Sequence, residues 1–388
     1  MNKENILEIY VHIPFCEQKC HYCDFVSFPM TTDMITKYIS VLIDELRGKS
    51  VFSKDKNITS IYIGGGTPSY IYAKHIEDII RTIYYNYNVS KNCEISIELN
   101  PHSALQEKMA VYKKIGINRL SFGVQSANDD ELKILGRLHN YGDFLKSYDD
   151  AVHLDFKNIN ADVISGIPNQ TAISYKNSLK KIMQLHLQHI SIYNLIIEPN
   201  TLFYKLYQNN NLYLPDEDTM TAIDNITDEL TNYYNYKQYE ISNYAKDNFI
   251  CLHNYGYWSD VDYLGIGLNA SSYLSNVRYK NLLNFNEYIN LDYKQFEENE
   301  NKNIYFDEIN ILSKKELISE YIFLGMRKMS GINSIEFFQK FKENIEDIYK
   351  GVLDRYLELG LIKHIDNNYF LSKRGMQVSN RIFSDFIL

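Results

Sequence analysis

Residues 10–25 read YVHIPFCEQKCHYCDF, an apolar run that leads into three cysteines with the spacing C-x3-C-x2-C. The chain of 388 residues has five cysteines in all, so three of them fall within eight positions. Three thiols cannot all pair as disulfides, and they are one ligand short of a closed zinc site. The first residues, MNKENILEIY, show no basic segment followed by a long apolar one, so we expect a cytoplasmic protein with reduced thiols.

The spacing of Cys16, Cys20 and Cys23 on one loop lets three thiolates converge on a single centre. His21 lies between two of them and keeps zinc open as an interpretation. Iron–sulfur clusters are also held by cysteine thiolates, and a four-iron cluster with three cysteines leaves one iron free. That iron can accept the amino and carboxylate groups of S-adenosylmethionine (SAM), and an electron from the cluster then breaks the sulfonium carbon–sulfur bond. The cysteine pattern favours the cluster over zinc.

Short apolar or alternating runs recur through the first two-thirds of the chain, and each ends at glycine, proline or polar residues. Six of them predict strands, at residues 6–14, 60–66, 93–101, 119–125, 158–166 and 189–198. Amphipathic stretches lie between them, such as HIEDIIRTIYYNY, in which isoleucines recur at helical spacing. Six strand–helix units in series predict an α/β fold with a parallel sheet, open or curled into a barrel.

Unusual residues close these strands at the same point of each unit. In chain order they are the three cysteines, Gly64 to Gly66, Glu98, Gln125, Asp162, and Ile196 with Glu198. The strands of a parallel barrel direct their carboxyl ends to one face, where catalytic groups gather, so one site explains the pattern. The glycine run lacks the Lys and Ser/Thr of a phosphate-binding loop and predicts a close approach of backbone to ligand. Inward-facing carboxylates need a partner, which the ammonium group of SAM would supply.

The net charge and the sequence pattern limit the possible partners and indicate the domain boundaries. The net charge of −9 argues against nucleic acid as a main partner, because phosphate binding needs a basic surface. We expect a barrel with its extension at 1–285, an acidic connector at 286–312 and a C-terminal domain at 313–388. That last part combines helical stretches with two β-rich runs and predicts a small, mostly helical, winged-helix-like domain with a packing or lid role.

Several blocks of the sequence resemble a known family. They are the cysteine motif, GGGTPS, ELNP, RLSFGVQSANDDELKILGRLHN and ADVISGIPNQT. They are similar to the radical SAM family that includes oxygen-independent coproporphyrinogen III oxidase, and more closely to its HemW-type heme chaperones. The resemblance implies a partial (β/α)6 TIM-like radical SAM barrel whose three cysteines hold a 4Fe–4S cluster. It implies SAM contacts at the matching positions, which are Tyr10, Tyr22, Gly65, Gly66, Thr67, Glu98, Gln125, Arg137, Asp162 and Ile196.

Two departures separate this chain from the oxidases. They carry a fourth cysteine two positions after the third, where this chain has Phe25, and an extension before the motif, for which Cys16 leaves no room. Both departures fit the HemW-type pattern, and HNYGYW at residues 253–258 resembles the H-N-x-x-Y-W signature associated with heme binding there. The resemblance therefore implies a protein that binds heme and transfers it to an acceptor. The alternative is the oxidase reaction, in which two propionates of coproporphyrinogen III become vinyl groups.

The segment CLHNYGYW supplies the candidate heme contacts. His253 could ligate the iron, Cys251 is a second axial or covalent candidate, and Tyr257 and Trp258 could pack on the porphyrin. A structural histidine beside a buried aromatic pair is the competing interpretation. The expected partners are heme as cargo, a heme acceptor such as a membrane-associated respiratory protein, and a flavodoxin or ferredoxin as electron donor if SAM is cleaved. A monomer and a dimer both stay open.

Overall fold

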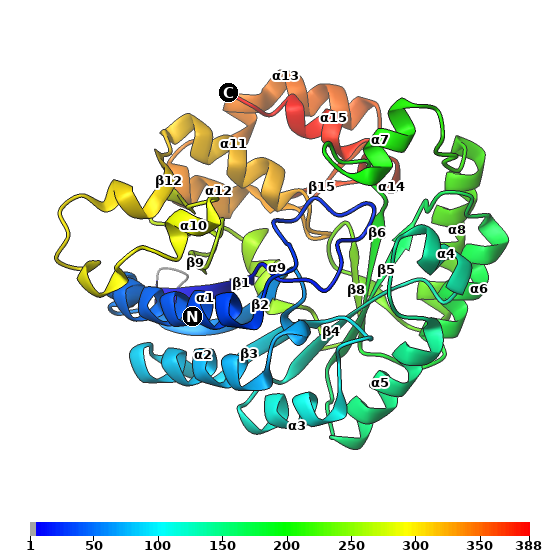
Figure 1. The fold of residues 1–388 in the computed structure, drawn as a ribbon. Helices are drawn as coiled ribbons and strands as arrows, with labels where there is room; N and C mark the ends of the chain where they lie inside the picture. The colour runs from blue at the N-terminus through cyan, green and yellow to red at the C-terminus, as the bar shows by residue number, and fades with distance from the viewer. Residues whose placement is uncertain (1–4) are drawn as a thin grey trace.

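The computed structural model describes residues 5–388, in which a twelve-stranded sheet forms the main body. The six strands expected from the sequence are consecutive parallel neighbours in the order β1 to β6. They are β1 (Ile6–Ile13), β2 (Asn57–Gly65), β3 (Val89–Leu99), β4 (Arg119–Gln125), β5 (Ile159–Ser165) and β6 (His189–Asn194). The sheet curves, and the loop after β1, drawn in dark blue, lies on its inner side (Figure 1). The predicted partial barrel is confirmed.

Helices follow the strands and cover the outer side of the sheet (Figure 1). The α-helices of this part are α1 (Thr32–Lys49), α2 (Ala73–Asn86), α3 (Gln106–Lys114), α4 (Asp129–Ile134), α5 (Tyr141–His153), α6 (Ala172–Met183), α7 (Leu202–Gln208), α8 (Glu217–Tyr233), α9 (Leu252–Tyr257) and α10 (Phe285–Tyr288). Short 3-10 turns lie at η2 (Ser50–Ser53), η3 (Pro68–Tyr70), η4 (Tyr293–Gln295) and η5 (Lys302–Tyr305). Within residues 5–388, none of the helices has both the length and the apolar character that crossing a membrane requires.

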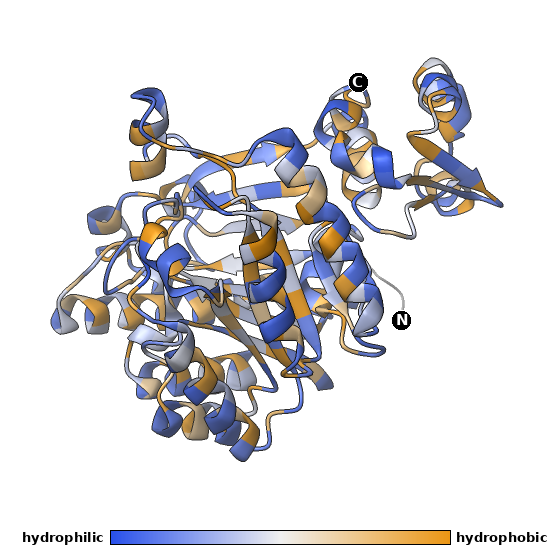
Figure 2. Ribbon diagram, turned by 90° about the vertical axis from the view of Figure 1, so that its right-hand side faces the viewer, coloured by the Kyte–Doolittle hydropathy of each residue, from blue (hydrophilic) through white to orange (hydrophobic). Residues whose placement is uncertain are grey.

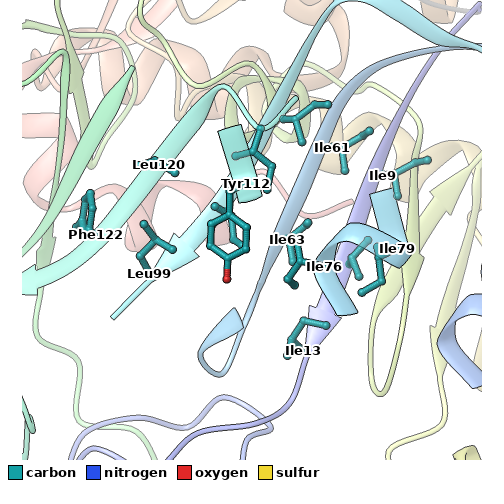
Figure 3. Packing of buried hydrophobic residues seen from close by; sticks show 14 of the residues in the cluster. Ile9, Ile13, Ile61, Ile63, Ile76, Ile79, Leu99, Tyr112, Leu120 and Phe122 are labelled. Carbon is teal, nitrogen blue, oxygen red and sulfur yellow. The ribbon is translucent and has the colours of Figure 1, made fainter. Parts of the chain in front are cut away.

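The alternation of side chains along the strands decides which face becomes the core and which the site. In β1, Ile9 and Ile13 are wholly buried in the apolar cluster, whereas the alternate positions are Glu8, Tyr10 and His12. Figure 3 shows the apolar set from several elements packed together: Ile9, Ile13, Ile61, Ile63, Ile76, Ile79, Leu99, Tyr112, Leu120 and Phe122. The apolar core therefore lies between the sheet and its outer helices, and the inner face of the sheet carries polar side chains.

The sheet extends beyond the six predicted strands on both edges. Next to β1 come β9 (Tyr263–Ile266), β10 (Ser271–Leu274), β11 (Val277–Asn281) and β12 (Phe306–Ile311), and next to β6 come β8 (Asn243–Ala245) and β7 (Lys237–Gln238). Only β9 of this group runs parallel to its neighbour in the barrel; β10, β11 and β12 pair antiparallel. The extension beside β1 widens the inner face at the edge where β1 carries Tyr10 and His12.

The segment at residues 286–312, for which we expected an acidic connector, has regular structure of its own. It contains most of α10, then η4, η5 and β12, and β12 pairs with β11 as the outermost strand of the main sheet. Tyr288, Tyr293 and Phe296 are wholly buried and belong to the same apolar cluster as the barrel strands. The acidic residues between them cover the outside, so the composition concealed an aromatic core segment.

A C-terminal module begins after β12. It contains α11 (Lys314–Gly325), α12 (Ser334–Phe341), α13 (Ile345–Glu358), α14 (Lys373–Gln377) and α15 (Ser379–Ser384), with a small sheet of β13 (Ile332–Asn333), β14 (Ile362–Ile365) and β15 (Asn368–Leu371). Its buried residues form an apolar cluster of their own, which includes Ile322, Phe337, Ile345 and Phe386. Figure 2 shows this module projecting from the main body of the molecule beside the C-terminus.

Candidate functional site

The three-cysteine loop follows β1 directly and is fixed at its base and at His21 in its middle. The Cys16 amide donates to the Phe28 carbonyl at 3.3 Å, which closes the base of the loop. The His21 amide donates to the Leu135 carbonyl at 3.0 Å, and its ring Nδ1 donates to the Ile134 carbonyl at 2.9 Å. His21 therefore attaches the loop to the end of α4. Among residues 5–388, no three His, Cys, Asp or Glu side chains are arranged around the position of a single metal ion.

The thiols of the loop lie in a mixed environment of burial and positive charge. Cys16 is buried, Cys20 and Cys23 are half-buried, and all three are free. Burial raises the pKa of the Cys23 thiol to about 11, and burial also raises the pKa of Cys16. Arg137 Nη1 donates to the Cys20 sulfur at 3.5 Å, and Arg137 Nε is buried without a partner. Thiolates in such a place need a cation to hold them, which a bound metal centre supplies.

The glycines at the end of β2 let the backbone pass close to this loop. A Cβ at Gly66 would lie 3.0 Å from the Cys16 sulfur and 2.8 Å from the Phe15 carbonyl oxygen. Gly65 has a φ of +116°, and a Cβ there would lie 2.6 Å from the His12 ring. The next residue, Thr67, contacts Cys16 with its hydroxyl 3.3 Å from the sulfur. The backbone at the end of β2 therefore passes close to the cysteine loop, and the predicted approach to a ligand stays a prediction.

Two carboxylates stand on the inner face beside the glycines. Glu98 accepts from the Tyr62 hydroxyl at 2.9 Å and from the Gly65 amide at 3.1 Å. Desolvation, followed by repulsion from Asp162, raises the pKa of Glu98 to about 7. Asp162 accepts from Asn160 at 2.8 Å and from Ser121 at 3.3 Å, and burial raises its pKa as well. A cationic group placed between these carboxylates would restore their ionised form.

The remaining expected SAM contacts are distributed around this centre. The Tyr10 hydroxyl donates to His12 Nδ1 at 3.0 Å, and Tyr22 packs on Phe203 with ring centroids 6.4 Å apart. Gln125 has a φ of +66° at a bulge in β4. A Cβ at Gly123 would lie 2.9 Å from Gln125 Nε2 and 3.1 Å from Arg137 Nη2, so that glycine makes room for both side chains. Ile196 lies in the loop after β6 and is 65% exposed.

A cavity of about 380 Å³ lies beside this centre, at the junction of β1, the β9–β11 extension and α11. Tyr10 and His12 line it from β1, and Tyr257 and Trp258 line it from the end of α9. Arg278 of β11 and Glu320 of α11 are also among its walls. The aromatic half of HNYGYW thus reaches a cavity that shares two side chains with the inner face of β1.

The other half of that motif lies behind the cavity wall. His253 is wholly buried, Nδ1 lies 2.8 Å from the Ser60 hydroxyl, and Nε2 lies 2.9 Å from the Tyr257 hydroxyl. Burial lowers its pKa to about 3, so the ring is neutral. Cys251 is 1% exposed and its thiol contacts Glu94 at 3.5 Å. In this structure neither His253 nor Cys251 reaches the cavity as an iron ligand, and His253 instead supports Tyr257.

Sequence reasoning missed a polar interior beneath the site. It includes Glu8 beside His253, Glu94 at the Cys251 thiol, and a chain in which His189 Nδ1 lies 2.6 Å from Asn160 Oδ1. These residues occupy the polar positions of the period-two pattern in β1, β3, β5 and β6. The sequence signal for these residues is that polar and apolar residues alternate in each of these strands. This repeated alternation indicates an inner face of the sheet that is both buried and polar.

Comparison with known proteins bears on this arrangement. The sequence model of the Radical SAM superfamily matches residues 10–182, and that of the HemN C-terminal domain matches residues 312–378. The chain is 32% identical over 379 residues to the heme chaperone HemW of Bacillus subtilis, covering 97% of this chain and 98% of the relative. The chain belongs to the HemW family of radical SAM proteins.

Other HemW family members give the same result. The HemW protein of Lactococcus lactis is 33% identical over 379 residues, covering 98% of this chain and 97% of the relative. That of Escherichia coli is 34% identical over 265 residues, covering 68% and 69%. The solved structure of coproporphyrinogen III oxidase (HemN) from Escherichia coli superimposes with a TM-score of 0.84 at 21% identity, over 99% of this chain and 91% of that one. At this identity the likeness of this HemW-family chain to the oxidase is one of fold.

Proposed function

We propose that this chain is a heme chaperone, which binds heme in the cavity beside β1 and passes it to an acceptor protein. The observation that carries the proposal is that Tyr257 and Trp258 of HNYGYW line the same cavity as Tyr10 and His12. Aromatic walls suit a flat, apolar ring system, and a cavity of about 380 Å³ is in the range of small-molecule sites. The name of the relatives supports the choice of heme as cargo.

The proposal includes a 4Fe–4S cluster on Cys16, Cys20 and Cys23 with SAM beside it. The buried, unpartnered Arg137 Nε and the glycines that would collide with a Cβ support the fit of this group. When bound, the pair supplies one-electron cleavage of the SAM carbon–sulfur bond. The chain's own residues would hold and shield it: Arg137 would compensate thiolate charge, and Glu98 and Asp162 would hold the cationic part of SAM.

The other matching positions complete the proposed SAM site. They are Tyr10, Tyr22, Gly65, Gly66, Thr67, Gln125 and Ile196. Residues of β1, β2, β3, β4 and β5, or of the loops that follow these strands, lie on one inner face, which supports a single shared ligand for them. An electron donor, such as a flavodoxin or ferredoxin, belongs to the proposal only if SAM is cleaved in the working cycle.

Behind the wall of the proposed heme cavity, we assign His253 to the support of Tyr257. The carboxylate of Glu8 lies 3.7 Å from His253 Nδ1, and the Ser60 hydroxyl lies closer, at 2.8 Å. With Nδ1 protonated toward Ser60, Nε2 accepts from the Tyr257 hydroxyl and fixes the orientation of that ring. The histidine of the motif then acts through the tyrosine that lines the cavity.

Coproporphyrinogen oxidation remains the second candidate, because the arrangement proposed for cluster and SAM is that of an enzyme. Against it, Phe25 stands where the oxidases have their fourth cysteine, and it is 62% exposed. An exposed phenylalanine offers no metal ligand and no polar group at that point. The assay below includes this reaction.

One anaerobically reconstituted sample tests both functions. Hemin is titrated and followed by its absorbance, and the loaded protein is mixed with apomyoglobin as a generic acceptor. The same sample then receives coproporphyrinogen III, SAM and a reductant. The proposal predicts binding of one hemin per chain, transfer to apomyoglobin and no decarboxylated product. Product formation would replace the proposal with the oxidase, and a failure to bind hemin would refute it.

A further inference from the structure

The heme cavity has one strongly cationic wall residue whose donors are only partly used. Arg278 of β11 donates from Nε to Glu320 Oε1 at 3.1 Å and from Nη2 to Glu320 Oε2 at 2.6 Å. Its Nη1 donates to the Tyr263 hydroxyl at 3.0 Å, and its guanidinium stacks on Tyr273 at 5.2 Å from the ring centroid. These bonds use three of the five N–H groups of the guanidinium, which is rigidly oriented by the stack.

A second donor, on a residue of the same cavity wall, has no acceptor. The indole Nε1 of Trp258 is buried without a hydrogen-bond partner, although Trp258 lines the cavity. A buried N–H that finds no acceptor is costly, and native proteins keep few of them. Because that nitrogen is buried, Trp258 contributes its ring to the wall, and Arg278 carries the N–H groups that an acceptor on a ligand can reach.

The partner of Arg278 belongs to a different part of the chain. Glu320 lies on α11, so the Arg278–Glu320 pair joins the C-terminal module to the sheet at the cavity. Their side chains are 33% and 21% exposed, so the pair is accessible to a competing carboxylate. Asp260, another cavity residue, pairs with Lys340 of α12, which keeps a second connection between the two parts.

We propose that Arg278 recognises a carboxylate of the porphyrin cargo, and that this carboxylate replaces Glu320 on the guanidinium. The inference rests on the proposed function and names the chemical feature of the cargo that the site recognises. One guanidinium fork binds one carboxylate in bidentate geometry, so the two carboxylates compete for it. Binding of the cargo then releases α11 from β11 at this point, while the Asp260–Lys340 pair remains.

The competing explanation is that Arg278 and Glu320 form a structural ion pair only. The two explanations predict opposite signs for one substitution. If Glu320 competes with the cargo, Glu320→Gln weakens the competitor and hemin binds more tightly. If the pair is structural, Glu320→Gln leaves hemin affinity unchanged or lowers it through loss of local order.

The experiment titrates hemin and hemin dimethyl ester, whose carboxylates are blocked, into wild type, Arg278→Gln and Glu320→Gln. We expect Arg278→Gln to lower the affinity for hemin about tenfold, because it removes a charge-assisted pair with the carboxylate. We expect Glu320→Gln to raise that affinity about threefold, because it weakens the competing pair. The ester should bind all three proteins alike. Arg355→Gln is the matched control, because Arg355 pairs with Asp385 inside the C-terminal module and away from the cavity walls.

Equal effects on hemin and ester, or an unchanged or lowered hemin affinity in Glu320→Gln, would overturn the inference. Thermal unfolding of each variant shows whether it is folded. If Arg278→Gln does not fold, the wild-type preference for hemin over the ester and the sign of the Glu320→Gln effect still decide. If wild type binds hemin and the ester with equal affinity, the inference about Arg278 fails and the proposed function stands. If wild type binds neither compound, the proposed function fails with it.

Discussion

The cysteine loop after β1 and the HNYGYW segment at α9 both carry sequence motifs, but the structure uses them differently. Cys16, Cys20 and Cys23, the proposed cluster ligands, follow the end of a strand and lie beside Gly66 and Arg137. In HNYGYW the residue with the most evident chemistry, His253, is wholly buried and the aromatic residues line the cavity. The two motifs thus differ in which of their side chains the packing leaves accessible: two thiols of the loop are half-buried, whereas the histidine of HNYGYW is wholly buried.

The largest expected effect concerns the loop. Cys20→Ser should abolish the iron–sulfur cluster, because a three-thiol site has no spare ligand. Cys93→Ala is the control, since Cys93 is buried in the apolar cluster of the barrel. Iron and sulfide analysis after anaerobic reconstitution measures the result. A cluster retained in Cys20→Ser, or lost in Cys93→Ala, would contradict the assignment of the loop.

The next effect concerns the carboxylates beside the loop. Desolvation raises the pKa of Glu98 to about 7, so its carboxyl is protonated in acid and ionises as the pH rises. If SAM binds to the ionised form, its affinity should rise about tenfold from pH 6 to pH 8. Glu98→Gln should lower the affinity for SAM about tenfold at pH 8 and reduce the pH dependence of that affinity. Calorimetric titration measures both, and an unchanged pH profile in the variant would remove Glu98 from the site.

The same ionisation has a sign for stability. The pKa of Glu98 is raised in the folded chain, so the folded state holds a proton that the unfolded state releases between its ordinary pKa and pH 7. The contribution of Glu98 to stability is therefore present in acid and lost as the pH rises to about 7. Denaturant unfolding of the cofactor-free chain at pH 5 and pH 8 should show this loss in wild type and less of it in Glu98→Gln.

A smaller effect is expected at the cavity wall. Trp258→Leu should lower the affinity for hemin about fivefold, because a stacked aromatic face contributes about 1 kcal/mol of binding free energy beyond the burial of its surface area. Tyr85→Phe, at a position on α2 that is 90% exposed, is a control outside the cavity walls. Absorbance titration gives the affinities. Equal hemin affinity in Trp258→Leu and wild type would move the heme away from this wall.

The smallest effect on heme is expected at the histidine of the motif. His253→Ala should change hemin affinity by less than about threefold and leave the heme spectrum intact, because the ring does not reach the cavity. It should lower the free energy of unfolding by about 2 kcal/mol, since the Ser60 and Tyr257 hydroxyls lose a buried partner. Loss of the heme spectrum in a folded variant would make His253 the ligand and reverse the comparison.

The sequence predicted the barrel and the position of the loop because both depend on short-range signals. Six β-rich runs ended by glycine, proline or polar residues suffice to place Glu98 near the end of its strand, whereas Asp162, expected near the end of the fifth run, lies in the middle of β5. The burial of His253 depends on contacts with β1 and β2, which no local pattern reveals. Likewise, β7 has only two residues, which is too short for a sequence pattern to indicate a strand. The acidic residues around Tyr293 and Phe296 concealed the burial of these two aromatic side chains. Pairing at the edges of the sheet and the orientation of α9 are long-range properties.

The most direct test of the account is an iron anomalous map from crystals of the reconstituted protein loaded with hemin. The account predicts two iron positions, one at the thiols of Cys16, Cys20 and Cys23 and one in the cavity lined by Tyr257 and Trp258. A heme iron bound outside that cavity, or an absence of iron at the three thiols, would contradict it.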